Sequence, residues 1–305
     1  MKTKTRGPQA IAPALFSARL GVAKTYKMYV GGAFVRSESG RTFSISQSYG
    51  NDTRTVQMPL GSRKDIRDAV GVAATAQEGW WARTAYNRGQ ILYRLAEMTD
   101  ARRHELVESL VAAGATEPDA RRELAASVDR IVYYAGMCDK LGALLASSNP
   151  VSGPHFGFSV PEPTGLVGVV APESSSLLGL VSSVLPVLAG GNSVIAIASS
   201  KDPRTALVWA ECVATSDMPS GVLNIVSGAR AELALHLAKH REVRGVSLVG
   251  LRGDAAAAVD TAAADNCKRV FRKDSTRFES DADGQGLGWI EPFIETKSIW
   301  HPMGS

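Results

Sequence analysis

The chain has 305 residues, of which 45% are hydrophobic and 21% are charged, and this composition is typical of a globular protein with a substantial core. Its three cysteines, Cys138, Cys212 and Cys267, lie far apart without a nearby histidine, which argues against a disulfide framework or a zinc site. No apolar run approaches the roughly 20 residues that cross a bilayer. We therefore expect a cytoplasmic protein without a membrane or metal partner.

The net charge of +4 comes from the N-terminal region. Residues 1–37 contain seven Lys or Arg and no acidic residue, and subtracting these from the 34 basic residues leaves 27 against 30 acidic ones, a net of −3. A nucleic-acid partner is therefore not expected. Residues 1–27 are predicted to be a flexible basic leader, with an organelle transit peptide as the alternative.

Apolar periodicity predicts a strand pair followed by helices. The run from Met28 to Val35 predicts a β-hairpin around two glycines. Apolar residues then recur every three or four positions over 66–76 and again over 91–96, which predicts two helices. One further stripe predicts a single long helix: Leu124, Val128, Ile131, Ala135, Cys138, Leu141 and Leu145. A buried thiol in a helix interface is favoured for Cys138 over a catalytic one.

A change of pattern follows at residues 147–164, where four prolines exclude a helix and predict an extended hairpin. Beyond it, apolar strands alternate with helices. The strands are predicted over 165–172, 193–198, 222–228 and 245–250, and the helices over 177–188, 204–214, 231–239 and 254–264. This alternation predicts an α/β fold with a doubly wound parallel sheet, which places ligands at the carboxyl ends of its strands.

Several segments, in order along the chain, resemble the aldehyde dehydrogenase superfamily: YVGGAFVRSESGRTF, YYAGMCDK, EPTGLVGVVAP, LPVLAGGNSVI, MPSGVLNIVSG and DNCKRV. The end, EPFIETKSIWHPMG from Glu291 to Gly304, is similar to the C-terminal strand that helps hold the family's oligomers together. Ordered matches of this number are more specific than any single glycine motif.

The resemblance implies a Rossmann-like nucleotide-binding domain made of an N-terminal helical part, 28–146, and a sheet part, 165–278. It implies oligomerisation elements in the hairpin, 147–164, and in the C-terminal strand, 291–305, with a linker over 279–290. The family's separate catalytic domain, which carries its cysteine in a Gly-Gln-x-Cys setting, is expected to be missing. We therefore expect a shortened relative that lacks the catalytic domain and the catalytic cysteine.

Supporting catalytic positions also depart from the family pattern. The family's Pro-Trp-Asn segment, whose Asn donates to the oxyanion, corresponds to Pro172, Glu173 and Ser174. Ser174 retains a donor, but Glu173 adds negative charge beside a site that must stabilise negative charge. The Glu-Leu-Gly-Gly segment, source of the general base, corresponds to Lys273-Asp274-Ser275-Thr276, and a protonated Lys273 is not a base. We predict no catalytic residue, only degenerate positions at Ser174 and Lys273.

Cofactor positions have changed as well. Ile197 and Ser200 replace the Lys and Glu that hold the adenosine ribose in the family. At the phosphate-facing turn, Leu251 and Arg252 replace hydroxyl donors, and Asp254 is expected to cap the next helix and occupy its N–H groups. The vestigial cofactor positions are Pro172, Ser174, Ile197, Ser200, Gly228, Gly250 and Leu251. The resemblance implies NAD or NADP, and we predict weak or absent binding.

Three hypotheses follow for the function. The leading one is a non-catalytic subunit, a pseudoenzyme, that associates with a full-length aldehyde dehydrogenase. The alternative is an NAD(P)-dependent oxidoreductase acting on aldehydes, and the third is a decayed gene product. The partner prediction rests on the strand-like segment from Phe293 to Trp300, which we expect to add to a complete relative or to another copy. The alternative for this tail is that it folds back onto its own sheet.

Overall fold

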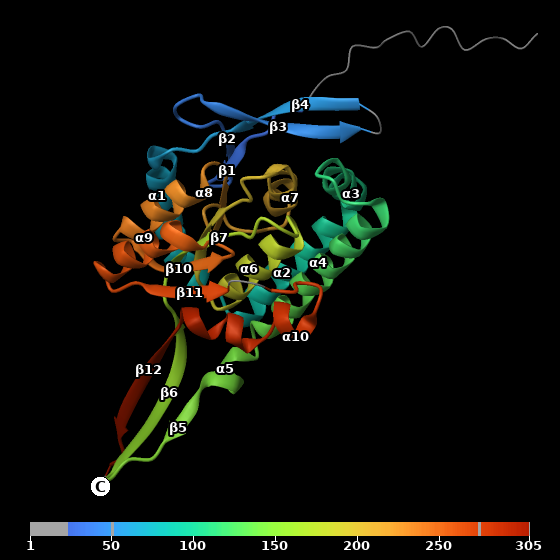
Figure 1. Ribbon diagram of the computed structural model, residues 1–305. Helices are drawn as coiled ribbons and strands as arrows, with labels where there is room; N and C mark the ends of the chain where they lie inside the picture. The colour runs from blue at the N-terminus through green and yellow to red at the C-terminus, as the bar shows by residue number, and fades with distance from the viewer. Residues whose placement is uncertain (1–23, 50–51, 274–275, 305) are drawn as a thin grey trace, which may run out of the picture.

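The computed structural model describes residues 24–49, 52–273 and 276–304. Its largest sheet has seven strands in the order β11-β10-β7-β8-β9-β1-β2. Five neighbouring strands are parallel (Figure 1): β7 (Leu166–Val170), β8 (Ser193–Ile197), β9 (Leu223–Val226), β10 (Val243–Val249) and β11 (Arg269–Lys273). The predicted parallel α/β sheet is confirmed, and β11 extends it by a strand that the pattern did not single out.

A β-hairpin closes one edge of this sheet. β1 (Met28–Val30) pairs antiparallel with β2 (Ala33–Val35) and with β9, as the glycine-centred signal predicts for the hairpin. Gly32 lies in the turn at φ 81°, and a Cβ there would come within 2.3 Å of the Ser220 hydroxyl oxygen. Only glycine therefore fits both the backbone conformation and the space at this position.

Helices cover both faces of the sheet. α1 (Arg63–Trp81), α8 (Arg230–Lys239) and α9 (Gly253–Ala264) pack on one face, and α6 (Leu178–Ala189) and α7 (Arg204–Ala214) pack on the other. A further layer of α2 (Ala85–Ala101), α3 (Arg103–Ala112) and α4 (Glu117–Met137) lies against α6 and α7 (Figure 1). None of the helices in the described part of the chain is both long and apolar enough to cross a membrane.

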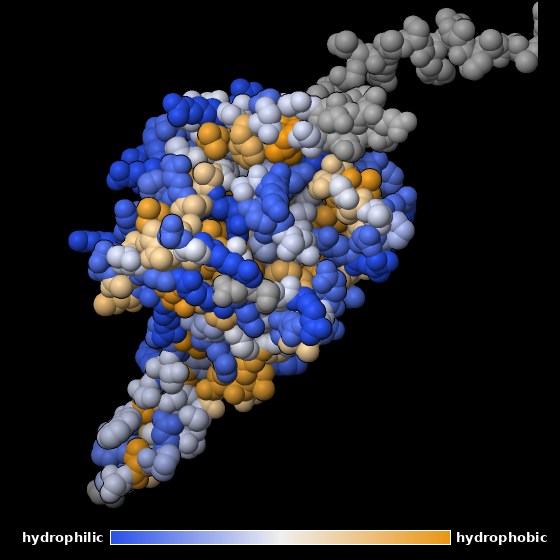
Figure 2. Space-filling model, in the orientation of Figure 1, coloured by the Kyte–Doolittle hydropathy of each residue, from blue (hydrophilic) through white to orange (hydrophobic). Residues whose placement is uncertain are grey.

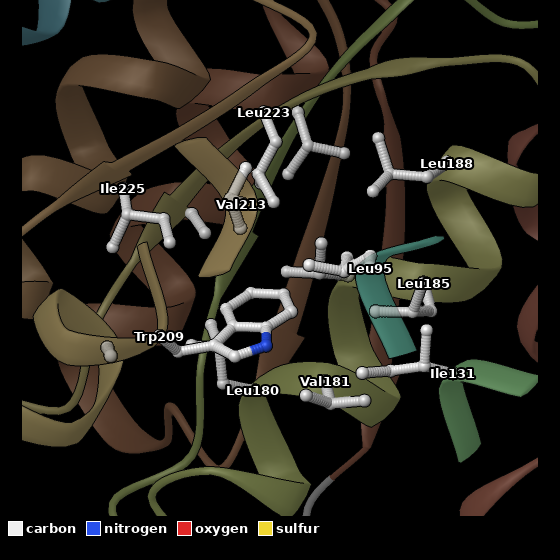
Figure 3. Close-up of a cluster of buried hydrophobic side chains, with 14 of the residues drawn as sticks. Leu95, Ile131, Leu180, Val181, Leu185, Leu188, Trp209, Val213, Leu223 and Ile225 are labelled. Carbon is white, nitrogen blue, oxygen red and sulfur yellow. The ribbon is translucent and has the colours of Figure 1, made fainter. Parts of the chain in front are cut away.

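The larger of the two main cores lies between α6, α7 and the outer helical layer. Trp209 stands at its centre with Leu95, Ile131 and Leu180 around it (Figure 3). The indole N–H of Trp209 donates to the Thr99 hydroxyl at 3.1 Å, so its polar atom is satisfied inside the core.

One predicted helix is wrong, and one strand pair was not predicted. The stripe over 124–145 is not one helix, because α4 ends at Met137 and a turn over 138–140 precedes α5 (Leu141–Leu145). The turn contains backbone hydrogen bonds between residues three apart, such as the one from Lys140 N to Met137 O. Leu141, which follows the turn, is buried in the core. A second antiparallel pair, β3 (Thr42–Tyr49) and β4 (Asp52–Pro59), was not predicted.

An antiparallel arm projects from the body (Figure 1). It consists of β5 (Ser147–Asn149), β6 (His155–Pro163) and β12 (Ile294–Pro302), in the order β12-β6-β5. β12 pairs with β6 of the same chain over its whole length, from Ile294 opposite Pro163 to Pro302 opposite His155. The tail thus follows the alternative prediction and lies on its own hairpin, which leaves the outer edge of β12 without a strand neighbour in the described sheet.

The segment that connects β11 to β12, predicted as a linker over 279–290, is packed structure. It contains α10 (Asp281–Gly284) and two turns of 3-10 helix, η1 (Leu287–Trp289) and η2 (Glu291–Phe293). We call residues 276–293 the bridge. Trp289 and Phe293 of the bridge are buried against Phe271 of β11 at ring-centroid distances of 5.5 Å and 6.0 Å. The bridge therefore packs against β11, the edge strand of the sheet. In the described part of the chain, no separate domain lies between β11 and β12.

Candidate functional site at the carboxyl edge of the sheet

The parallel strands bring the vestigial cofactor positions to one edge. Pro172 and Ser174 follow β7, Ser200 follows β8, Gly228 follows β9, and Gly250 and Leu251 follow β10. Because β8 and β10 flank β7 on opposite sides, the chain reverses its direction of winding beside β7. In doubly wound sheets this reversal opens the crevice where ligands bind.

A carboxylate of the chain itself lies in this region. The carboxylate of Glu173 accepts hydrogen bonds from the hydroxyls of Ser199 and Ser200, both at 2.5 Å. The backbone N–H of Lys201 also donates to it at 3.1 Å, as does that of Ser200 at 3.4 Å. Burial of Glu173 opposes its ionisation, but these donors and the nearby Arg230 prevail and lower its pKa to about 2. Glu173 is therefore charged at neutral pH and joins the loop after β7 to the loop after β8.

Arg230 is the cationic partner of Glu173. Its guanidinium donates to the Glu173 carboxylate at 2.9 Å. The same guanidinium donates to the carbonyl oxygens of Ala171, at 2.6 Å, and Val249, at 3.0 Å, so it bridges the ends of β7 and β10. Arg230 is only 7% exposed. Arg230 was not predicted as a site residue, because nothing in its local sequence pattern separates it from a surface arginine at the start of a helix.

Glu173 adds a negative charge beside the degenerate oxyanion position. This charge is balanced by Arg230 and by four hydrogen-bond donors from the loop after β8. Ser174, the degenerate donor position, is exposed and lies next to this network.

Of the remaining cofactor positions, two lie in the hydrophobic core and two lie in turns. Ile197 is fully buried and Leu251 is nearly so, and both belong to the apolar cluster beneath α8 and α9. Neither side chain presents a polar group to a ribose or a phosphate. Gly228 and Gly250 occupy left-handed turns at φ 152° and 69°, so their glycine character serves the backbone at these strand ends.

Asp254 does not form the predicted helix cap. α9 begins at Gly253 with Arg252 as its N-cap residue, and the Arg252 side chain makes no cap hydrogen bond. Asp254 is in the first helical turn, where a carboxylate favours the helix dipole without replacing a cap. The expected competition between Asp254 and a phosphate for cap hydrogen bonds is therefore absent from the structure.

A second internal carboxylate caps the helix beside Ser174. Glu123 of α4 accepts hydrogen bonds from the backbone N–H groups of Leu177 and Leu178, at 2.9 and 3.1 Å, at the start of α6. Its burial raises its pKa above the ordinary value, although these two bonds act in the opposite direction. Glu123, which the sequence did not single out, takes up the first N–H donors of this helix.

The degenerate base position and the thiols offer no assembled nucleophile. The ammonium of Lys273 lies 5.4 Å from the ring centroid of Trp289 in a cation–π arrangement. Cys138 and Cys212 are buried, and burial raises the pKa of each thiol to about 12. Cys267 is exposed at the end of α9, and the sheet edge at which the vestigial positions meet lies at the other end of that helix. Among the described residues, no group of three His, Cys, Asp or Glu is placed to hold a metal ion.

The comparison with known families decides the classification. The model of the aldehyde dehydrogenase family matches residues 34–272, which is most of the chain. This chain belongs to the aldehyde dehydrogenase family. The match covers the helical layer, the parallel sheet and the candidate site, and it ends at β11, where the bridge begins.

Relatives of the chain are longer than it is. The chain is 30% identical to mouse cytosolic 10-formyltetrahydrofolate dehydrogenase over 258 residues, which are 83% of this chain and 28% of that protein. It is 34% identical to hydroxyisobutyraldehyde dehydrogenase of Mycolicibacterium austroafricanum over 226 residues, 73% of this chain and 44% of that protein. Each relative therefore contains more than twice the length that it shares with this chain.

Solved structures give the same result for the fold. HpcC from Thermus thermophilus superposes with a TM-score of 0.75 at 27% identity, covering 82% of this chain and 48% of that one. An NAD+ complex of aldehyde dehydrogenase from Bacillus cereus superposes with a TM-score of 0.76 at 24% identity, covering 82% of this chain and 50% of that one. The chain thus spans about half the length of these structures, as expected for a shortened relative.

Proposed function

We propose that this chain is a non-catalytic subunit of the aldehyde dehydrogenase family that associates with a catalytically complete relative. The observation that carries the proposal is the Glu173–Arg230 pair, which lies where the family resemblance places cofactor and oxyanion contacts. The ion pair already engages most of the donors that a substrate oxyanion would need at this position. The relatives named above are dehydrogenases, and this chain is similar to 28% and 44% of their lengths.

The residues at this edge do not fit a nicotinamide dinucleotide. The ribose positions hold a buried Ile197 and a Ser200 already bonded to Glu173, and the phosphate turn holds a buried Leu251. Several hydrogen bonds of about 1 kcal/mol each are absent, and this loss predicts affinity lower by orders of magnitude. We infer that NAD and NADP bind weakly or not at all at physiological concentrations, and we derive no chemical step through either cofactor.

The arm supplies the surface for association. Phe156, Trp300 and Met303 are exposed on it, and Leu144 of α5 is exposed at its base. Figure 2 shows hydrophobic residues along the arm and a hydrophobic patch over α5. An exposed strand edge beside apolar side chains favours strand addition to another chain. Since the bridge leaves this chain without a domain to receive the arm, we propose a full-length relative as the partner and a second copy as the alternative.

Co-expression with a full-length relative from the same organism tests the proposal. We expect the two chains to co-purify, with a mass by light scattering that requires both. Trp300→Ser should weaken the association by about tenfold or more, since a buried aromatic anchor contributes about 2 kcal/mol or more to an interface. Tyr86→Ser is the matched control, because Tyr86 on α2 is 66% exposed and Trp300 is 67% exposed. Equal effects of the two substitutions, or a chain that remains alone, would contradict the proposed association.

A further inference from the structure

Arg230 occupies the position at which doubly wound sheets receive ligands. Its guanidinium joins the carbonyl oxygen of Ala171, which follows β7, to that of Val249, which ends β10. These two strands are neighbours in the sheet, and the direction of winding reverses between them. A buried cation held at this crevice by two carbonyl groups has a fixed position and a fixed orientation.

The groups around Glu173 have the chemistry of an anion receptor. They consist of two serine hydroxyls, the N–H groups of Ser200 and Lys201, and one guanidinium, all of which donate toward the same carboxylate. Phosphate oxygens accept the same set of donors, and a planar guanidinium suits them particularly well. In addition, the Nε of Arg230 is buried without a hydrogen-bond partner, so the receptor retains a donor that Glu173 does not satisfy.

We propose that Glu173 is an internal plug that occupies an anion-binding site formed by Arg230, Ser199, Ser200 and the backbone of Lys201, and that it excludes phosphate-bearing ligands from the crevice. Because this carboxylate is on the same chain, it competes as an intramolecular ligand, and a free anion must displace it to enter. The plug therefore stays in place at neutral pH. This inference concerns the crevice alone and holds whether or not the arm binds another subunit.

Removing the plug should open the site to a free anion. In the full-length chain, Glu173→Ala leaves Arg230 and the two hydroxyls without their shared acceptor. We expect calorimetry with inorganic pyrophosphate to show saturable binding to Glu173→Ala, about tenfold or more tighter than any binding to the wild type. Adding Arg230→Met to this variant should abolish the gain. Glu279→Ala is the matched control, because it removes the same charge from an exposed position near Ser175 and leaves the plug intact.

Each outcome decides for or against the plug. Pyrophosphate binding by the wild type as tight as that by Glu173→Ala, or a folded Glu173→Ala without gain, overturns it. Glu173→Gln serves as a second variant, since its amide retains an acceptor for a hydroxyl but loses the charge. If both variants are unfolded, millimolar pyrophosphate should restore their circular dichroism, because an anion that binds only the folded state stabilises it. Failure of pyrophosphate to do so also overturns the proposal.

Discussion

The Glu173 carboxylate is held by donors from two segments of the chain, the loop after β8 and the start of α8. It lies at the sheet edge that serves ligand binding in doubly wound folds. The stability of the folded chain should therefore depend on the ionisation of this one carboxylate.

The first prediction is an acid-dependent loss of stability. The pKa of Glu173 is lowered from 4.5 to about 2 by its hydrogen bonds and Arg230, against the effect of burial. Its stabilising contribution is thus fully present above pH 4.5 and is lost as the pH falls toward 2. After discounting for the part of the side chain that remains exposed, this contribution is on the order of 2 kcal/mol.

Denaturant unfolding of the wild type and Glu173→Gln at several pH values measures this contribution. The difference between the two proteins should shrink as the pH falls from 5 to about 2. The comparison must be a difference, because the raised pKa of Glu123 acts in the opposite direction in both proteins. A difference independent of pH would show that Glu173 is not charged in the folded chain.

The second prediction concerns the thiols. Cys138 and Cys212 are buried with raised pKa values, whereas Cys267 is exposed. A thiol–disulfide exchange reagent should therefore label one cysteine in the native chain and all three after denaturation. The single labelled residue should disappear in Cys267→Ala. Rapid native labelling of Cys138 or Cys212 would indicate an activated thiol that the structure does not contain.

At the scale of elements, the bridge packs closely against helix α4. The guanidinium of Arg130 on α4 donates to the carbonyl oxygens of Phe278 and Gly284 and to the Ser182 hydroxyl. The Arg130 side chain is 1% exposed. A Cβ at Gly284 would come within 2.6 Å of this guanidinium, so the bridge and the helix fit each other closely. Such complementarity favours a folded product over a decayed one.

The third prediction tests this contact. Arg130→Met leaves two buried carbonyl groups and a hydroxyl without their donor and should destabilise the chain by about 3 kcal/mol. Arg121→Met on the same helix is the matched control, because the Arg121 side chain is 66% exposed and pairs with Glu117 four residues away. The control should change the free energy of unfolding by about 0.5 kcal/mol or less. Equal losses in the two variants would exclude a special role for Arg130.

The elements also show how far the sequence predicts this structure. The helix over 204–214 and the hairpin at 28–35 are marked by local periodicity and by glycines, and both were predicted with the bounds observed. The turn at 138–140 contains no glycine or proline to signal the break, and Gly136 lies before it, inside the helix. The sequence over 279–290 predicts a linker because its short turns show no hydrophobic periodicity. Their burial depends on Arg130, which is far away in the sequence.

The candidate site was predictable in position but not in content. Its edge follows from the alternation of strands and helices, which places all the vestigial residues at the same ends of parallel strands. The pairing of Glu173 with Arg230 depends on how α8 begins relative to β7 and β10, and no local signal encodes that relation. The predicted Asp254 cap is wrong because helix α9 starts one residue earlier than its pattern predicts.

At the scale of the whole molecule, the chain combines a preserved family scaffold with an occupied ligand edge and an exposed arm. The scaffold explains its similarity to dehydrogenases along most of its own length and about half of theirs. The packed bridge and the exposed arm are consistent with the proposed subunit, which would contribute binding surfaces and no catalytic residues. The central claim is therefore that the chain alone does not oxidise aldehydes.

Assaying the purified chain for reduction of NAD and NADP with short, long and aromatic aldehydes tests this claim most directly. Among the described residues, no thiol is placed with a base at the sheet edge, so we expect no thiohemiacetal that releases hydride. We expect no reduced nucleotide above the level given by a Cys267→Ala preparation. Turnover that is present in the wild type and lost in Cys267→Ala or Cys212→Ala would contradict the account.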